Sequence, residues 1–220
     1  MQEQLSEQEL VRRESLSRIR EMGINPYPAA SFPVNTSSAL IKAGYNAESE
    51  PFADVCIAGR LMQVRVMGKA SFAEIQDSTG RIQLYVNRDE ICPDEDKSFY
   101  NDFFKKLLDI GDIIGVKGYA FVTQTGELTV RVRELHLLAK ALRPLPIVKT
   151  DAEGQVHDAF TDPEQRYRQR YVDLIVNEGV RETFIQRSRM IQEMRMFMVG
   201  EGYLEVETPI LQPVYGGALA

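Results

Sequence analysis

The chain has 220 residues and a formal net charge of −6, with 44% hydrophobic, 26% charged and 9% aromatic residues. This acidic balance excludes a protein that coats nucleic acid mainly through its phosphates, because such proteins are usually basic. No apolar run approaches the roughly 20 residues of a membrane-spanning helix, and the polar N-terminus lacks the apolar core of a signal peptide, so we expect a cytoplasmic protein without a membrane partner.

The cysteines and histidines do not form a metal-binding pattern. Cys56 and Cys92 make no CxxC pair, and His136 and His157 have no metal-ligating neighbours at useful spacing. A structural zinc site normally needs four such ligands, so we expect no metal site and two isolated thiols in a reducing compartment.

The first 22 residues have helical spacing. One stripe is apolar and the opposite face is basic, and Gly23 supplies a helix stop. The expected apolar stripe is Leu5, Leu10 or Val11, Leu16, Ile19 and Met22, and the basic face is Arg12, Arg13, Arg18 and Arg20. The segment NPYPAASFP follows, and its three prolines predict an extended connector. Residues 1–52 are therefore expected to be an N-terminal helix and connector.

Residues 53–140 have the pattern of a small β-barrel. Alternating residues and short turns predict three strands, then a helix, then two more strands. Five strands with one helix between the third and fourth is the order of an OB-fold barrel, which predicts a mainly β domain with flanking helices. In order, the elements are ADVCIAGRLMQVRVMGK, SFAEIQ, RIQLYVN, the helix KSFYNDFFKKLL, GDIIGVKGYAFVTQ and GELTVRVRELHLL.

The last third of the chain predicts a proline-rich linker and the start of another domain. Residues 141–160 lack periodicity, and residues 161–220 begin with a helix for which Thr161 or Asp162 can be the cap and Pro163 the first residue. A longer helix is expected over about 181–199, followed by a strand at YLEVE. This is the expected incomplete start of an α+β domain.

Four side chains on the predicted barrel have the chemistry to bind a short unpaired RNA loop. Phe72 offers a ring for base stacking, and Gln83 offers both a donor and an acceptor to a base edge. Arg65 suits a phosphate or a base carbonyl, and Glu127 can accept from a base N–H. For each residue alone a simpler interpretation stays open: a core phenylalanine, and solvated polar side chains.

The segment GKASFAEIQDSTGRIQLYV closely resembles the second and third strands of the anticodon-binding domain of lysyl-tRNA synthetases. Aspartyl and asparaginyl enzymes share the barrel with looser similarity. The resemblance implies that Phe72 stacks on an anticodon base, that Gln83 reads the central uridine, and that Arg65 and Glu127 also contact the anticodon.

ALRPLP and RYRQRYVDL look like the linker and the catalytic-domain entry of the same family. The RYRQRYVDL segment contains a dense basic and aromatic cluster: Arg166, Arg168, Arg170, Tyr167 and Tyr171. A tRNA contact is one interpretation of this cluster. We favour the other, in which the arginines pair with nearby acids and the tyrosines pack on the domain.

GYLEVETPIL resembles motif 1 of class II aminoacyl-tRNA synthetases, in which a long helix and a strand ending in proline form a homodimer interface. The family proline matches Pro209, and a simple core helix is the alternative. The apolar residues expected at that interface are Phe184, Ile191, Met194 and Met198.

VYGGALA resembles the loop after motif 1, where backbone groups approach the lysine substrate. Gly216 and Gly217 match the paired glycines, which would let a ligand come close to the backbone. The family usually has an Ile-Pro pair before them, whereas this chain has Val214 and Tyr215, so the shape of the loop is open.

The resemblance implies an intact enzyme that uses ATP and magnesium to attach lysine to tRNA(Lys), acts as a homodimer and has no DNA partner. Motifs 2 and 3 are not found after Pro209, so we expect no catalytic residue, ATP or magnesium in this chain. The 220 residues alone are expected not to charge tRNA. The alternatives are a non-catalytic OB-fold tRNA-binding module and a relative specific for aspartate or asparagine.

Overall fold

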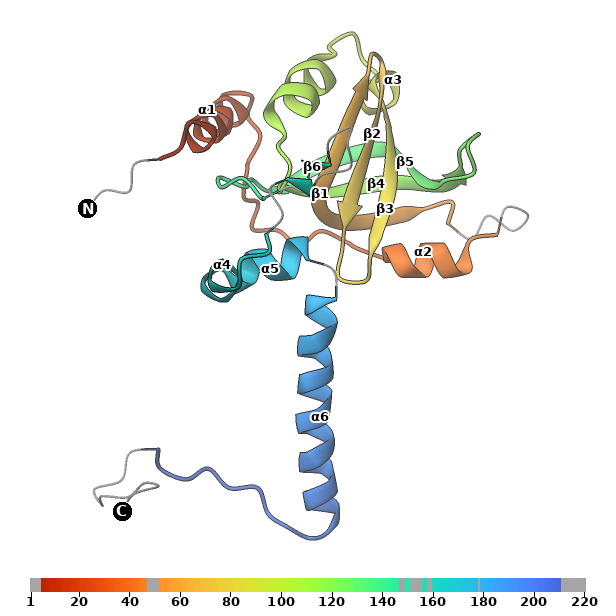
Figure 1. Cartoon of the computed structure of the whole chain (residues 1–220). Coiled ribbons are helices and arrows are strands. Elements are labelled where there is room, and N and C mark those ends of the chain that lie inside the picture. Colours follow the sequence, from red (N-terminus) through yellow and green to blue (C-terminus); the bar gives the residue numbers. More distant parts are fainter. Residues whose placement is uncertain are drawn as a thin grey trace. The chain divides into compact units, whose positions relative to one another are not determined.

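The computed structural model describes residues 5–46, 52–146, 149–150, 156–157, 160–177 and 179–210. The chain divides into two compact units, residues 1–145 and residues 146–220 (Figure 1). Each unit is described by itself.

The first unit is built on a closed five-stranded barrel with strand order β1-β2-β3-β5-β4. Strands β3 and β5 pair in parallel and all other neighbours are antiparallel, which closes the barrel without a free edge. The predicted OB-fold order is therefore confirmed. The strands are β1 (Val55–Met67), β2 (Ala70–Gln76), β3 (Arg81–Asn87), β4 (Ile113–Val122) and β5 (Leu128–Ala139).

The interior of the barrel follows from the two-residue period of its strands. Along β2 and β3 every second residue is buried, and the residues between them are half-buried on the outer face. Inside, the apolar side chains of all five strands form one core. The tight approach of β4 to β5 depends on Gly118, because a Cβ there would lie 1.8 Å from the carbonyl oxygen of Arg131.

Helix α2 (Ser38–Gly44) is one of the described elements that the sequence did not predict. Residues within the expected extended connector form it, and its N-cap Ser37 accepts from the backbone N–H of Leu40. The helix is attached to the β2–β3 turn, where Asp77 accepts hydrogen bonds from Ser38 N and Ser38 Oγ at 2.6 and 2.8 Å. The prediction of an extended connector was wrong here because this attachment joins residues 39 positions apart.

The helical segment between β3 and β4 is wound more loosely than expected. After the short α3 (Arg88–Ile91) comes η1 (Phe99–Leu107), a π-helix in which residues bond five positions back. This winding turns Tyr100 fully inward, with its hydroxyl 2.8 Å from Ser71 Oγ. Phe103, Phe104 and Leu107 are buried in the core, whereas Phe99 and Leu108 are only partly buried.

Helix α1 (Glu7–Glu21) is confirmed, and the faces assigned to it were partly right, because Ile19 of the apolar stripe is fully buried. Leu10 and Val11 are 55% and 54% exposed, whereas Arg12 of the predicted solvent face is buried. Arg12 turns inward because its guanidinium donates to the carbonyl oxygens of Ile110 and Ala141, at 2.9 and 3.1 Å. A buried charge of this kind is tolerated only with such partners.

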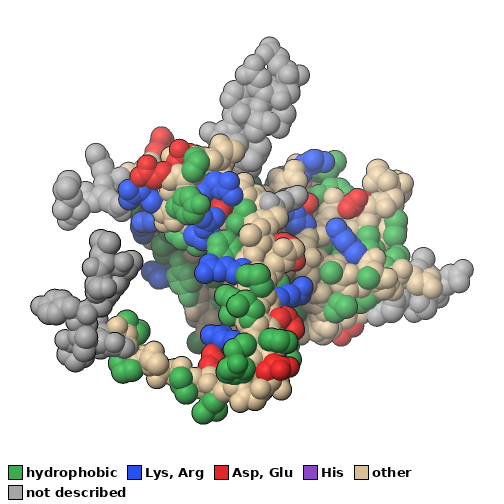
Figure 2. Space-filling model, turned by 60° about the horizontal axis from the view of Figure 1, so that its bottom comes forward, with side chains coloured by type: hydrophobic (Ala, Val, Ile, Leu, Met, Phe, Trp, Pro, Cys, Tyr) green, Lys and Arg blue, Asp and Glu red, His purple; other side chains and the backbone are tan. Residues whose placement is uncertain are grey.

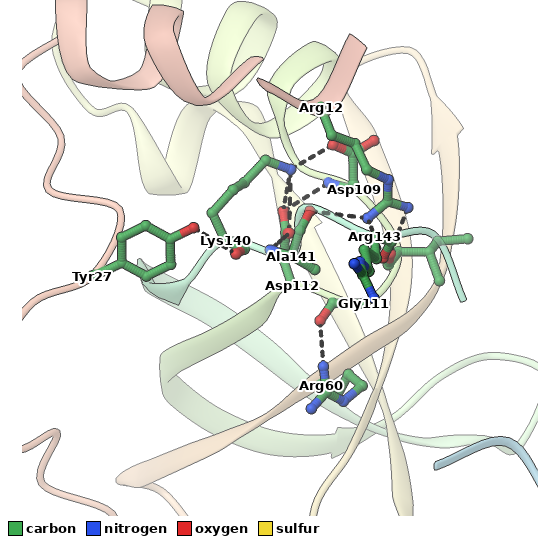
Figure 3. Close-up of polar contacts among 10 residues, drawn as sticks. Arg12, Tyr27, Arg60, Asp109, Gly111, Asp112, Lys140, Ala141 and Arg143 are labelled. Carbon is green, nitrogen blue, oxygen red and sulfur yellow. Dashed lines mark hydrogen bonds and ion pairs between the residues drawn. The ribbon is translucent and has the colours of Figure 1, made fainter. Parts of the chain in front are cut away.

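Arg12 borders a buried ionic cluster where the chain leaves the barrel, defined by Lys140, Asp109 and Asp112 (Figure 3). The ammonium group of Lys140 contacts both carboxylates, and Lys140 and Asp112 have no exposed side-chain surface. Burial raises the pKa of Asp112, while Lys140 and the backbone N–H groups of Asp109 and Ala141 act in the opposite direction. The connector joins the cluster through Tyr27, whose hydroxyl donates to the carbonyl oxygen of Lys140 at 2.9 Å.

The second unit contains a small hairpin and three described helices. As predicted, Asp162 caps the first of these helices and Pro163 is its first residue. The YLEVE segment is not a strand in the described part of the chain, which corrects the prediction; a strand needs a neighbouring strand for its backbone groups, and this segment is exposed. The elements are β6 (Lys149–Thr150), β7 (Val156–His157), α4 (Pro163–Arg168), α5 (Arg170–Val176) and α6 (Val180–Gly200).

Candidate nucleic-acid interface

Phe72 and Gln83 lie on the outer face of two adjoining strands. Phe72 is paired with Tyr85, and Gln83 is paired with Glu74, so the two residues are diagonal neighbours on the β2–β3 face. Both are half-buried, while the residues that flank them along each strand point into the core. Both side chains therefore face outward, and the alternative of a core phenylalanine at position 72 does not hold.

Four aromatic rings form a continuous row across this outer face. Phe72 and Tyr85 have ring centroids 5.4 Å apart, Tyr85 and Phe121 are 6.1 Å apart, and Phe121 and Tyr119 are 6.3 Å apart. We call these four residues the aromatic row. It runs from β2 over β3 and across β5 to β4. Only Phe72 was predicted to belong to the site. The alternation in IQLYV and GYAFV carries the signal for the others, but their proximity depends on barrel closure.

Arginines from β5 lie against this row. The guanidinium of Arg131 is 5.5 Å from the ring centroid of Tyr85, and that of Arg133 is 4.9 Å from the ring centroid of Tyr119. Arg131 is held by Glu90 of α3, whose carboxylate accepts hydrogen bonds from Arg131 Nε, at 2.8 Å, and from a terminal guanidinium nitrogen. Flat rings beside guanidinium groups are a suitable surface for unstacked bases and their phosphates.

Gln83 is held in place from the neighbouring strand. Its amide nitrogen donates to Thr129 Oγ1 at 2.9 Å, and the Thr129 hydroxyl donates to the carbonyl oxygen of Glu127 at 3.1 Å. These contacts connect two of the residues singled out from the sequence. Because an anchored amide loses little side-chain freedom on binding, the arrangement favours recognition of a base edge.

Arg65 and Glu127 lie at the borders of the face. Arg65 is exposed on β1, directly opposite Phe72 on β2. Glu127 is exposed and lies one residue before β5, rather than in the strand as expected, in a turn where Thr123 N donates to its carbonyl oxygen at 3.0 Å. The β4–β5 turn needs a positive φ of 85° at Gly126, which glycine adopts without strain.

The arginines of the RYRQRY segment pair with acids, as favoured from the sequence. Asp173 is fully buried and binds both Arg166 and Arg170, and Arg168 pairs with Glu164 on the helix surface. The packing expected of the tyrosines was wrong, because Tyr167 and Tyr171 are 76% and 56% exposed.

Helix α6 presents apolar side chains to solvent, among charged ones (Figure 2). Among the residues matched to motif 1, Met194 is 62% exposed, and Pro209 lies in the exposed segment after the helix. Gly216 and Gly217 lie outside the described residues. The other expected interface residues are Phe184, Ile191 and Met198, at 39%, 36% and 43% exposure.

The described residues contain no group of three or more His, Cys, Asp or Glu side chains that could hold a metal ion. None of the helices in the described ranges is long and apolar enough to cross a membrane.

Comparison with protein families assigns both parts of the chain. Residues 55–138 match the OB-fold nucleic acid binding domain family, and residues 162–220 match the family of class II tRNA synthetases (D, K and N). The chain thus combines a nucleic-acid-binding barrel with part of a class II synthetase domain.

Relatives with the name lysine–tRNA ligase match nearly the whole chain. The ligase of Christiangramia forsetii is 60% identical over 99% of this chain, that of Porphyromonas gingivalis W83 is 57% identical over 99%, and that of Azobacteroides pseudotrichonymphae is 53% identical over 98%. The chain spans 38%, 38% and 43% of the length of these relatives. Over the part that it shares with them, the chain belongs to the lysine–tRNA ligase family.

Proposed function

We propose that the chain supplies anticodon recognition to an ATP-dependent lysine–tRNA ligase. The single observation that carries this proposal is the shared outward direction of Phe72 and Gln83 on adjoining barrel strands. A ring and an anchored amide on one face suit an unpaired loop, in which bases are splayed and their edges are free. High identity to lysine–tRNA ligases supports lysine over aspartate or asparagine.

Each of the four residues receives a role in this proposal. Phe72 stacks on one anticodon base, and Gln83 reads the central uridine, which offers one carbonyl–NH–carbonyl edge. Arg65, exposed at the border, contacts a phosphate or a base carbonyl, and Glu127 accepts from a base N–H. The net charge of −6 is compatible with this local mode of binding, because Arg131 and Arg133 lie against the aromatic row.

The chemical step is proposed for the ligase as a whole. It attaches lysine to tRNA(Lys) through lysyl-adenylate, with ATP and magnesium supplying the activation chemistry. The described residues do not fit a magnesium site, and we assign no step of the reaction to them. A free-standing module without catalysis is disfavoured by the class II synthetase match over residues 162–220. The cytoplasm is the proposed location, where tRNA is charged.

We further propose that α6 and the segment to Pro209 pack against a second copy of the protein. Exposed side chains such as Met194 and Phe197, at 62% and 66%, are more apolar than an ordinary solvent face. Analytical ultracentrifugation of the wild-type chain and of the Met194→Lys variant measures their oligomeric state. A wild-type dimer that the variant dissociates is expected, whereas a wild-type monomer would contradict the proposal.

Binding to two RNA hairpins tests the anticodon proposal. The chain is titrated with anticodon stem-loops that differ only in the triplet, one with UUU and one with GUC. We expect clearly tighter binding of the UUU loop, because in this proposal Gln83 and Glu127 bind the carbonyl–NH–carbonyl edges of uridines. Equal affinity for both loops would show that the barrel does not read a lysine anticodon.

A further inference from the structure

The aromatic row continues past the residues that the anticodon proposal uses. The anticodon proposal uses residues on β2, on β3 and just before β5, namely Phe72, Gln83 and Glu127. The row extends further along β4, through Phe121 and Tyr119. Three strand spacings separate β2 from β4, which corresponds to about 14 Å in a sheet. The row is therefore longer than the part of it that lies on β2 and β3.

The far end of the row carries its own charged partner. Arg133 is exposed and lies 4.9 Å from the ring centroid of Tyr119. Within the described part of the chain Arg133 makes no ion pair, in contrast to Arg131, which Glu90 holds. Its charge is therefore available to a phosphate. Because the guanidinium lies over the Tyr119 ring, a base that stacks on that face takes its place there, and Arg133 can then bind the phosphate of the same nucleotide.

Local backbone geometry explains why Arg133 faces the ring. The register between β4 and β5 shifts between Lys117 and Gly118, so that Arg133 is an extra residue opposite this step. Bulges of this kind redirect a side chain and frequently lie next to functional sites. Gly118 permits the close approach, because a side chain there would collide with the β5 backbone.

We propose that Tyr119 and Arg133 form an additional nucleotide subsite, which takes a nucleotide of the same RNA loop that flanks the anticodon triplet. Tyr119 stacks on its base and Arg133 binds its phosphate. The proposal rests on the proposed function, because it assumes that the triplet lies over Phe72 and Gln83. It is supported by the continuity of the row and by the match of a positive guanidinium to a phosphate.

The test measures the affinity of the chain for UUU stem-loops with an intact loop or with one flanking base removed, on the 5′ or the 3′ side. Because Tyr119→Ala removes the stacking of one base, it should weaken binding of the intact loop by about 5- to 150-fold. Tyr119→Phe retains affinity, and Tyr119→Leu, which keeps apolar bulk, does not. On the loop that lacks the flanking base, Tyr119→Ala causes no further loss.

The phosphate contact has a separate readout. Arg133→Gln should make log affinity fall less steeply with log salt, with a slope smaller in magnitude by about 0.7–0.9. Lys106→Gln, which removes a charge paired with Asp102 on η1, should leave this slope unchanged. Wild-type affinity in Tyr119→Ala, or an equal loss on both loops, overturns the subsite. If Phe72→Ala weakens binding while Tyr119→Ala does not, only the subsite fails; if neither does, the anticodon proposal fails as well.

Discussion

Phe72 and Tyr85 lie opposite each other on β2 and β3, with ring centroids 5.4 Å apart and ring planes inclined by 58°. Tilted pairs of this kind are favourable and hold both rings in place. Because neither ring enters the barrel core, both remain partly open to solvent. Phe72 is thus a supported platform rather than a mobile side chain, and the first prediction concerns its removal.

Phe72→Ala is expected to weaken binding of the UUU stem-loop by about 1–3 kcal/mol, because it removes a base-stacking surface. Calorimetric titration measures the change. Leu10→Ala, which truncates an exposed apolar side chain on α1, is the control and should bind as the wild type does. Unchanged affinity in Phe72→Ala would remove this residue from the RNA interface.

Removing one charge from the buried ionic cluster should strongly destabilise the protein. Lys140→Met leaves Asp109 and Asp112 without their ammonium partner, and breaking a buried pair in this way costs about 3–5 kcal/mol. Urea unfolding measures the loss. Lys117→Met removes an exposed partner of Glu134 and should have little effect. Equal losses in the two variants would contradict the importance assigned to burial.

Asp77 should make stability depend on pH. Burial works against its ionisation, but hydrogen bonds from Ser38 and Thr79 outweigh burial and lower the pKa of Asp77. Its stabilising contribution is therefore complete above the unfolded-state pKa near 3.9 and is lost as pH falls through the lower folded-state pKa.

Asp77→Asn tests this dependence. The variant should lose on the order of 1–3 kcal/mol of unfolding free energy at about pH 7, because several hydrogen bonds to a charged group are weakened. Below about pH 4 the difference from the wild type should shrink. A difference that stays constant over this range would exclude the carboxylate charge as its cause.

Much of the barrel could be predicted from local patterns. Strand alternation depends on neighbouring residues only, and it indicated the five-strand order. The outward direction of Phe72 was not fixed in this way, because a core position stayed open for it. The long helix α6 was predicted within a few residues because Gly200 and Gly202 mark its end.

What the sequence did not reveal depends on contacts between distant residues. Arg12 is buried because it meets carbonyl groups 98 and 129 positions later, and α2 is attached to a turn formed by β2 and β3. Phe121 and Arg131 reach Tyr85 only because β3 pairs with β5 as the barrel closes. No local pattern encodes these pairings.

The most direct test of anticodon reading is the response of Gln83→Leu to a single base change. The affinities of the wild type and of this variant are compared for stem-loops with UUU and with UCU triplets. The wild type should prefer the central uridine by about 1–3 kcal/mol, and the variant should lose that preference, because leucine has no donor or acceptor. A variant that still prefers UUU as strongly as the wild type would contradict the proposal that this face of the barrel reads the central base.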